Sequence, residues 1–274
     1  RVYGGVEAIA VEQLPVPTPS AGEVVLAVRA AGIDRGALHL LTGTPLVARL
    51  ALGLRRPRQP ILGLEVAGEV VAVGPDATSF AVGDRVFGTA AGSFATYAVA
   101  RADRITHTPA GVSDEQAATL GISGGTALIA VRDRAQVQAG QRVLVLGASG
   151  GVGSFATQLA VQAGAEVTAV ASAAKADFVR SLGAAYVHDY RAVGLDAMGG
   201  PFDAIIDIGG NHRLRELRRA LTRSGTLVIV GGEEGGRLLG GIHRNVVADL
   251  LNPFVPQRLG WFVQSSSGEL SADL

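Results

Sequence analysis

The first third of the chain alternates short apolar runs with glycine, proline and aspartate. Apolar and β-branched residues gather at 23–31, 66–73, 84–88 and 94–100. Runs of this length, separated by turn residues, are typical of strands in a small, mostly antiparallel barrel. We therefore expect a separate first domain over residues 1–111, built mainly from strands.

After Pro109 the pattern changes to alternating helices and strands. Ser113 is a suitable N-cap for a helix over 114–120, and a second helix is expected over 126–134. Further strands are expected near Val143, Val167, Tyr186, Ala204, Leu227 and Phe262, and further helices near Phe155, Asp177, Leu214 and Val247. This alternation predicts an α/β domain over 112–274, with a doubly wound parallel sheet.

One segment of this second domain carries the clearest chemical signal. An aliphatic strand over 142–146 runs into a glycine turn, a helix over 152–163 and a second strand over 167–171. Gly150 would let a pyrophosphate approach the backbone, and Gly153 would let the helix pack against the strand. Flanked in this way, the turn predicts a dinucleotide site, although a tight turn without a ligand is the alternative. The expected cofactor-binding residues are Ala148, which replaces the first glycine of the usual motif, Ser149, Gly150, Gly151, Val152 and Gly153.

The end of the second strand predicts which dinucleotide binds. An acidic residue about 20 positions beyond the glycines would select NAD by accepting from a free ribose hydroxyl. Here Ser172 and Lys175 follow the strand, and Glu166 lies at its opposite end. A hydroxyl and an ammonium suit a 2′-phosphate, so we expect NADPH. The alternatives are that Ser172 caps the next helix and that Lys175 is a solvated surface charge.

Composition limits the number of domains, the possible side-chain chemistry and the possible partners of the chain. The 274 residues favour two domains, and the absence of cysteine excludes disulfides, thiolate nucleophiles and cysteine zinc sites. With 24 basic and 24 acidic residues, net charge gives no reason to expect nucleic acid or an anionic membrane as a partner. Arg55, Arg56 and Arg58 are then interpreted as solvated surface. Without a long apolar run or a signal peptide, the chain is expected in the cytoplasm.

Motifs spread along the chain resemble a known superfamily. In order, they are GEVVLAV preceded by VPTP, then AAGI, GLEVAGEVVAVG, FAVGDRVFG, GSFATYAV, SGGTAL and GASGGVG. Together they resemble the medium-chain dehydrogenase/reductase superfamily, and most of all its zinc-independent, quinone-oxidoreductase-like branch. The resemblance implies a GroES-like catalytic barrel, a Rossmann cofactor domain and an active site in the cleft between them. Because family members continue past the sixth Rossmann strand, we also expect this chain to be incomplete at its C-terminus.

The resemblance adds further site residues. It implies that Thr126 approaches the nicotinamide ribose and that Tyr190 flanks the 2′-phosphate. Glycines that end the fourth and fifth strands would also meet the cofactor, or else serve only as turn residues; they are Gly209, Gly210, Gly231 and Gly232. Tyr3 and Phe94 are candidates for the substrate wall, although aromatic residues in such runs are more often core.

A metal centre is not expected. Zinc-dependent relatives carry a cysteine in the position of Asp34 and a His-Glu pair in the position of Leu64-Glu65. Leucine cannot coordinate a metal, and two carboxylates do not supply the three ligands of a catalytic zinc site. We interpret Glu65 as a residue that stabilises the barrel through polar contacts.

Two residues are candidates for proton transfer. His39 corresponds to a relay histidine of zinc alcohol dehydrogenases. In that relay an intermediate hydroxyl would lie at Gly36, which has none. A role of His39 as a pocket or surface residue is therefore as well supported as a role in proton transfer. Asp34 falls where zinc-independent relatives have a polar residue near the nicotinamide. In an apolar cleft its pKa would rise and it would donate a proton. The alternative is an N-cap for a helix over 35–41.

These residues predict an NADPH-dependent, zinc-independent oxidoreductase that transfers hydride to an activated C=C or C=O bond of a quinone, enone or aldehyde. An enoyl-thioester reductase of lipid or polyketide assembly is a related alternative. A non-catalytic NADPH sensor is an alternative of another class. We expect a homodimer, because the sixth strand, around 260–264, would leave an unpaired sheet edge.

Overall fold

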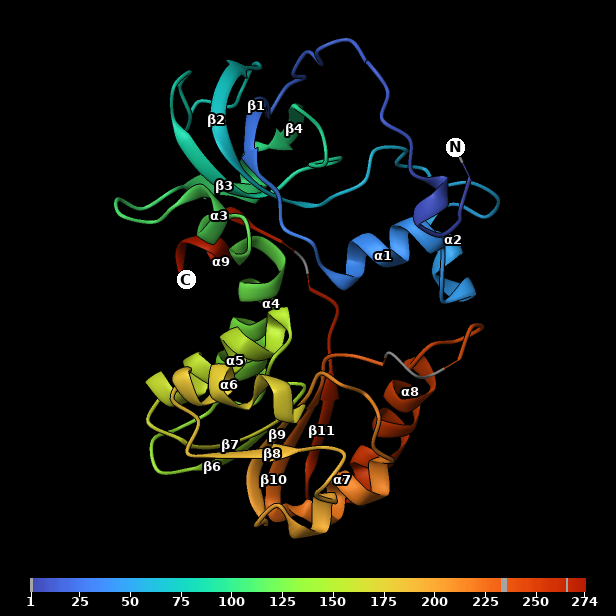
Figure 1. Ribbon diagram of the computed structural model, residues 1–274, viewed down its shortest axis with the longest axis vertical. Coiled ribbons are helices and arrows are strands. Elements are labelled where there is room, and N and C mark those ends of the chain that lie inside the picture. Colours follow the sequence, from blue (N-terminus) through green and yellow to red (C-terminus); the bar gives the residue numbers. More distant parts are fainter. Residues whose placement is uncertain (1, 233–235, 265) are drawn as a thin grey trace. The chain divides into compact units, whose positions relative to one another are not determined.

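The computed structural model describes residues 2–232, 236–264 and 266–274, which form two compact units (Figure 1). The first unit contains Arg1–Gly125 and Ser265–Leu274, and the second contains Thr126–Gln264. The sequence predicted a division after residue 111. The observed division falls later because the helix after Ser113 contacts the first sheet, as does the C-terminal helix.

The first unit is built around an antiparallel sheet of five strands in the order β4-β1-β2-β3-β5. The strands are β1 (Glu23–Ala30), β2 (Glu65–Val73), β3 (Arg85–Thr89), β4 (Tyr97–Arg101) and β5 (Ile105–His107). Val24, Leu26, Val66 and Val70 form its core with residues of β3 and β4. Four of these strands were predicted, whereas β5 has only three residues and shows no readable alternation.

Short helices complete the first unit. They are α1 (Arg35–Thr42), α2 (Arg49–Leu52), α3 (Asp114–Ala117) and α9 (Gly268–Ala272), with the 3₁₀ turns Val6–Ala8, Leu46–Ala48 and Ala102–Arg104 and a π-helical turn, η4 (Leu120–Gly124). Ser113 caps α3 in a reciprocal capping box with Gln116, which confirms the predicted helix start. α1 begins after Asp34 and ends at Gly43, whose φ of 61° is left-handed.

The second unit contains the predicted parallel sheet, and its six strands lie in the order β11-β10-β9-β6-β7-β8 (Figure 1). The strands are β6 (Arg142–Leu146), β7 (Glu166–Ala171), β8 (Tyr186–Asp189), β9 (Phe202–Asp207), β10 (Leu221–Ile229) and β11 (Arg258–Trp261). The helices are α4 (Gly125–Leu128), which continues as a π-helical segment over Ile129–Arg134, α5 (Gly151–Gln162), α6 (Ala176–Ser181), α7 (Leu214–Ala220) and α8 (Ile242–Leu251), with 3₁₀ turns at Ala173–Lys175, Leu195–Ala197 and Asn252–Phe254. The sixth strand lies earlier than expected, and Phe262 falls just beyond it.

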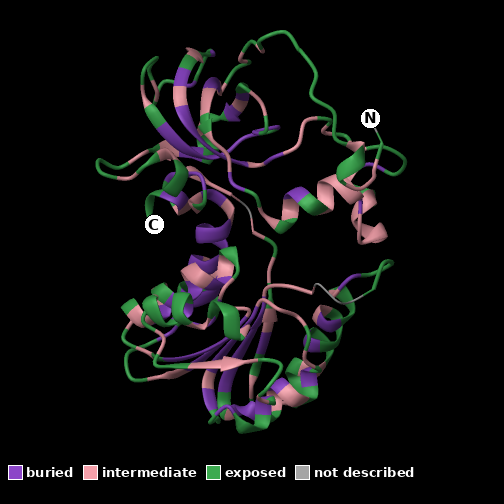
Figure 2. Ribbon diagram, viewed as in Figure 1, coloured by how far each residue is buried: buried purple, intermediate pink, exposed green. Residues whose placement is uncertain are grey.

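Both faces of the parallel sheet are covered. Val143 and Val145 of β6 pack with Ala156 and Ala160 of α5, whereas residues of the opposite parity, Leu144 and Leu146, pack with Leu217 of α7. Figure 2 shows the central strands β6, β7, β9 and β10 as buried along most of their length, whereas β8 is only partly buried. Burial on both faces explains why the strands appear in the sequence as continuous apolar runs. None of the helices in the described part of the chain is long and apolar enough to span a bilayer.

Candidate active site

The turn between β6 and α5 has the geometry of a dinucleotide-binding loop. A Cβ added to Gly153 would lie 2.1 Å from the carbonyl oxygen of Gly147, so only glycine lets the helix pack this closely on the turn. A Cβ on Gly150 would meet nothing nearer than this same oxygen, at 3.5 Å. The two glycines therefore have different roles. Packing within the protein requires glycine at position 153, whereas a Cβ at position 150 would make a single contact of ordinary length.

The N-terminus of α5 fits a phosphate group. Its N-cap, Gly150, offers no side chain to accept from the first turn, and the backbone ladder starts with Ser154, which donates to Gly150 at 2.9 Å. Free N–H groups at the positive end of a 12-residue helix provide an anion site. Ala148 is fully buried, so the departure from the usual glycine is accommodated within the turn.

The ends of β7 and β8 bring together the residues predicted to read a 2′-phosphate. Tyr190 donates its backbone N–H to Ala171 at 3.3 Å, which places it beside Ser172 and the 3₁₀ turn that ends at Lys175. The Ser172 side chain makes no capping hydrogen bond, so the capping alternative does not hold. The sequence analysis did not include Arg191, whose guanidinium lies 5.1 Å from the centre of the Tyr190 ring. Its position next to Tyr190 was the available signal.

The predicted glycines at the ends of β9 and β10 are held by the protein backbone itself. A Cβ on Gly231 would lie 2.1 Å from the carbonyl oxygen of Ile208, and one on Gly232 would lie 2.4 Å from the Cα atom of Gly241. Gly209 and Gly210 follow β9 after Ile208, and Gly210 donates its N–H to the Asp207 carboxylate at 3.0 Å. These contacts explain the glycines as turn residues, and their role toward a cofactor stays a prediction.

A buried ion pair, which was not predicted, stabilises the carboxyl ends of the parallel strands. Asp207, at the end of β9, is fully buried and pairs with Arg244 of α8, which is 8% exposed. The pair fixes α8 against the loop that carries Gly209 and Gly210.

Thr126, the first residue of the second unit, is buried and donates its hydroxyl to Gln264 Oε1.

Asp34 takes one of its two predicted roles, that of a helix cap, and its role in proton transfer stays a prediction. Its Oδ1 accepts the N–H of Ala37 at 2.7 Å and so caps α1. Its Oδ2 is buried, and no partner for it lies among the described residues. Because a buried carboxylate oxygen without a partner is costly, this atom is available to a hydrogen-bond donor of a ligand.

Glu65, at the start of β2, is the most buried acidic side chain of the first unit among those described, with 1% exposure. Its Oε1 accepts the backbone N–H groups of Ile122 at 2.8 Å and Ser123 at 2.9 Å. Burial raises the pKa of Glu65 to about 7; the two backbone hydrogen bonds oppose this rise, and the charge of Asp34 adds to it. These are the polar contacts that the sequence predicted for Glu65.

The other candidates in the first unit are anchored to its backbone. His39 Nδ1 donates to the carbonyl of Thr44 at 2.6 Å, since a carbonyl can only accept. The Tyr3 hydroxyl donates to the carbonyl of Gly53 at 2.7 Å, and the Arg49 guanidinium lies 4.4 Å from the centre of the Tyr3 ring. Phe94 precedes β4 and is 41% exposed, so it is not a core residue.

Within the described residues, the structure contains no cluster of three or more histidine, cysteine, aspartate or glutamate side chains suited to a metal. The absence of a metal centre remains a prediction from the sequence. The catalytic and substrate candidates thus belong to the first unit, and the cofactor candidates belong to the second.

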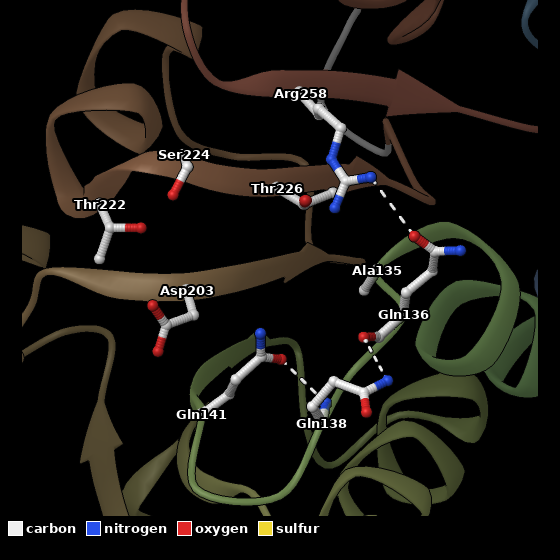
Figure 3. A pocket seen from close by; sticks show the side chains of 9 residues that line it. All are labelled: Ala135, Gln136, Gln138, Gln141, Asp203, Thr222, Ser224, Thr226 and Arg258. Carbon is white, nitrogen blue, oxygen red and sulfur yellow. Dashed lines mark hydrogen bonds between the residues drawn. The ribbon is translucent and has the colours of Figure 1, made fainter.

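A polar cavity of about 380 Å³ opens at the amino ends of the parallel strands. Figure 3 shows the side chains that line it. Gln141 precedes β6, and Asp203 and Arg258 lie at the amino ends of β9 and β11. Arg258 donates to Gln136 at 3.3 Å across this cavity. Ligands of open α/β sheets bind at the carboxyl ends of the strands, so this cavity is not the dinucleotide site.

Comparison with known proteins supports both halves of this description. Residues 20–110 match the alcohol dehydrogenase GroES-like domain, and residues 151–243 match the zinc-binding dehydrogenase domain. The chain is 33% identical to the chloroplast envelope quinone oxidoreductase homolog of Arabidopsis thaliana, covering 82% of this chain and 71% of that protein. It is 34% identical to the quinone oxidoreductase of Sus scrofa, covering 84% and 70%.

A second set of relatives consists of very long proteins. Erythronolide synthase EryA2 of Saccharopolyspora erythraea is 44% identical over 66% of this chain. The chain spans only 3–7% of the length of this and two other polyketide synthases that it matches at the same identity.

Solved structures show the same fold. The quinone oxidoreductase of Coxiella burnetii has a TM-score of 0.84 and 27% identity, and the comparison covers 99% of this chain and 83% of that one. The mycobacterial protein Rv1454c, solved with NADPH, has a TM-score of 0.80 and 27% identity, with coverage of 98% and 83%. A barrel joined to a dinucleotide-binding domain defines a class of nicotinamide-dependent oxidoreductases. Within this class, the chain belongs to the medium-chain dehydrogenase/reductase superfamily and to its quinone-oxidoreductase-like branch.

Proposed function

We propose that the chain is an NADPH-dependent, zinc-independent reductase that transfers hydride to an activated C=C or C=O bond. The observation that carries the proposal is the β6–α5 turn, in which packing requires Gly153, whereas a Cβ at Gly150 would make only one ordinary contact and no side chain caps the helix N-terminus. Membership of a superfamily of NAD(P)H-dependent oxidoreductases supports it. A bound nicotinamide would supply the hydride, so the protein needs no side-chain nucleophile.

In this proposal, residues of the second unit bind the cofactor phosphates and residues of the first unit supply the proton. In the second unit, the N-terminus of α5 would bind the pyrophosphate, and Ser172, Lys175 and Tyr190 would bind the 2′-phosphate. In the first unit, Asp34 is the candidate proton donor because its Oδ2 is buried without a described partner. His39 has only Nε2 left for such a role, since Nδ1 is bonded to Thr44.

We favour a quinone, enone or aldehyde as substrate over an enoyl thioester. The two quinone oxidoreductases align with 82% and 84% of this chain, and each is covered over about 70% of its own length. The three polyketide synthases align with 59–66% of the chain, although at the higher identity of 44%. Because of that identity, an enoyl-thioester reductase remains the second candidate. The sensor hypothesis, in contrast, has no supporting observation in the structure.

Steady-state NADPH consumption tests the proposal. The purified protein is assayed with a quinone, an α,β-unsaturated ketone, an aldehyde and a 2-enoyl thioester, before and after dialysis against a chelator. We expect turnover of one of the first three, unchanged by the chelator. Turnover of the thioester alone would support the second candidate. Tight NADPH binding without any turnover would support the sensor, and metal-dependent turnover would contradict zinc independence.

The association state and location are also proposals. β11 is an edge strand of the described sheet, and there the Asn252 side chain pairs with the N–H and C=O groups of Leu259. We expect a homodimer through the rest of this edge. Light scattering at micromolar concentration checks this, and a mass near 27.9 kDa would contradict it. The cytoplasmic location stays a prediction, which fractionation of expressing cells would check.

A further inference from the structure

A long stretch of the first unit carries positive charge without any acidic residue. Residues 35–64 contain five arginines and no aspartate or glutamate, in a chain whose total charge is +0. The balanced total therefore hides a strongly basic local segment. A local cluster of positive charge attracts a negatively charged partner even when the net charge of the whole chain is zero.

Three of these arginines lie in a loop that the fold holds in a defined shape. Gly53 ends α2 at a φ of 118°, and Arg58 donates its N–H to the carbonyl of Leu52 at 2.8 Å, which closes the loop. The Tyr3 hydroxyl donates to Gly53 at the same point. Figure 1 shows the N-terminal segment beside α1 and α2, where this bond forms. We call residues 53–60 the basic loop.

The basic loop presents both charged and apolar side chains to solvent. Arg55, Arg56 and Arg58 are exposed, and none has an ion-pair partner within the described residues. Leu54, in the same loop, and Leu50, one helical turn before it in α2, are each 67% exposed. Leucines exposed in this way lower solubility and contribute nothing to the core of the first unit. Their position beside unpaired arginines therefore suits a binding surface.

The geometry points to a peripheral binding surface for an anionic lipid bilayer, made of the basic loop and Leu50. Arginines would approach the lipid phosphates, while Leu50 and Leu54 would enter the boundary between headgroups and acyl chains. Arginine stems also cover apolar surface while their charge stays at the interface. This surface does not depend on cofactor binding or turnover, and it replaces the interpretation of these arginines as merely solvated.

Vesicle co-sedimentation tests this assignment with the intact chain. Extruded vesicles of phosphatidylcholine alone are compared with vesicles containing 30% phosphatidylserine, at low and at high salt. We expect at least tenfold stronger partitioning onto the anionic vesicles at low salt, and weaker partitioning at high salt because salt screens the arginines. Equal partitioning onto both vesicle types, or no partitioning onto either, would overturn the proposal.

Matched variants locate the surface. The triple variant Arg55→Ser, Arg56→Ser, Arg58→Ser should weaken anionic partitioning roughly a hundredfold. Leu50→Ser with Leu54→Ser should reduce the part of the binding that survives high salt. A control triple, Arg215→Ser, Arg219→Ser, Arg223→Ser, removes the same charge from exposed positions of the second unit. An equal loss in the control would overturn the assignment to the basic loop. Thermal unfolding and NADPH affinity of each variant show whether a loss reflects misfolding or a failure of the proposed cofactor site.

Discussion

The carboxylate of Glu65 accepts the backbone N–H of Ser123 at 2.9 Å, so a side chain from the start of β2 holds the π-helical turn η4. A Cβ on Gly32 would lie 2.5 Å from Glu65 Oε2, which shows how tightly the carboxylate is enclosed. The same enclosure that makes these hydrogen bonds strong also makes ionisation of Glu65 costly.

Stability should therefore fall as pH rises through the titration of Glu65. Its pKa rises from 4.5 to about 7 on folding, so between these values the folded chain holds a proton that the unfolded chain has released. The contribution is fully present below pH 4.5 and is lost as pH approaches 7. At 1.36 kcal/mol per pKa unit, the loss is about 3 kcal/mol.

The isosteric variant Glu65→Gln isolates this effect. It cannot ionise, yet its amide oxygen can still accept from Ile122 and Ser123. Denaturant unfolding between pH 5 and pH 8 should show the variant gaining stability relative to the wild type as pH rises. Glu69→Gln, an exposed change on the same strand, is the control. Parallel pH curves for the wild type and Glu65→Gln would contradict a titration of Glu65 in this range.

Alanine at the two glycines of the β6–α5 turn should separate packing from ligand binding. Gly153→Ala would force a Cβ to within 2.1 Å of a carbonyl oxygen, so we expect thermal destabilisation together with loss of NADPH binding. Gly150→Ala has room in the protein and an extended φ of −81°, so stability should change little. Its methyl group would instead occupy the space open to the pyrophosphate.

Thermal unfolding and calorimetric titration with NADPH measure the two effects separately. We expect Gly150→Ala to lose at least tenfold in NADPH affinity, which corresponds to about 1.4 kcal/mol. Unchanged affinity in a folded Gly150→Ala protein would mean that the pyrophosphate does not approach this turn.

The β6–α5 turn could be predicted from the sequence because its signal is local. Strand, turn and helix follow one another without interruption, and both strand and helix boundaries fall within one residue of the prediction. The helix cap was one of the two roles predicted for Asp34, and it could be predicted because the capping bond joins residues only three positions apart. In contrast, the partners of Glu65 lie 57 and 58 positions away, and Arg244 lies 37 positions from Asp207. The pattern of apolar and polar residues along the chain does not predict such pairs, because they form only when separate helices and strands pack together.

The 2′-phosphate hypothesis can be tested through an unusual feature of the sequence. Lys175 is the only lysine of the chain. Modification of its amine by an acetylating reagent, followed by peptide mapping, should be slowed by NADPH and much less by NADH. The reason is that only NADPH carries the phosphate expected to contact Lys175.

Affinities provide the quantitative form of this prediction. We expect NADPH to bind at least ten times more tightly than NADH, a difference of about 1.4 kcal/mol. Lys175→Ala should remove most of this preference while leaving NADH binding nearly unchanged. Arg191→Ala tests the residue that the structure adds beside Tyr190. Equal dissociation constants for the two cofactors in the wild type would refute the NADPH preference.

The Asp207–Arg244 pair predicts a strongly non-additive response to mutation. Arg244→Met leaves a fully buried carboxylate without its counter-ion, and such a change typically costs about 3–5 kcal/mol. Asp207→Asn keeps an oxygen for the N–H of Gly210 but leaves the guanidinium of Arg244 buried and unpaired. The double variant removes both charges, so it should be more stable than the sum of the two single losses predicts.

Urea unfolding of the four proteins in this cycle gives the coupling energy. An exposed pair provides the control, because Arg180 and Asp177 lie 2.6 Å apart with side chains 58% and 100% exposed. Arg180→Met should cost less than about 1 kcal/mol, since solvent screens such a pair. If Arg244→Met costs no more than Arg180→Met, the buried pair does not hold α8 against the sheet. A loss of NADPH affinity in Asp207→Asn beyond the loss of folded protein would further link the pair to the loop that carries Gly209 and Gly210.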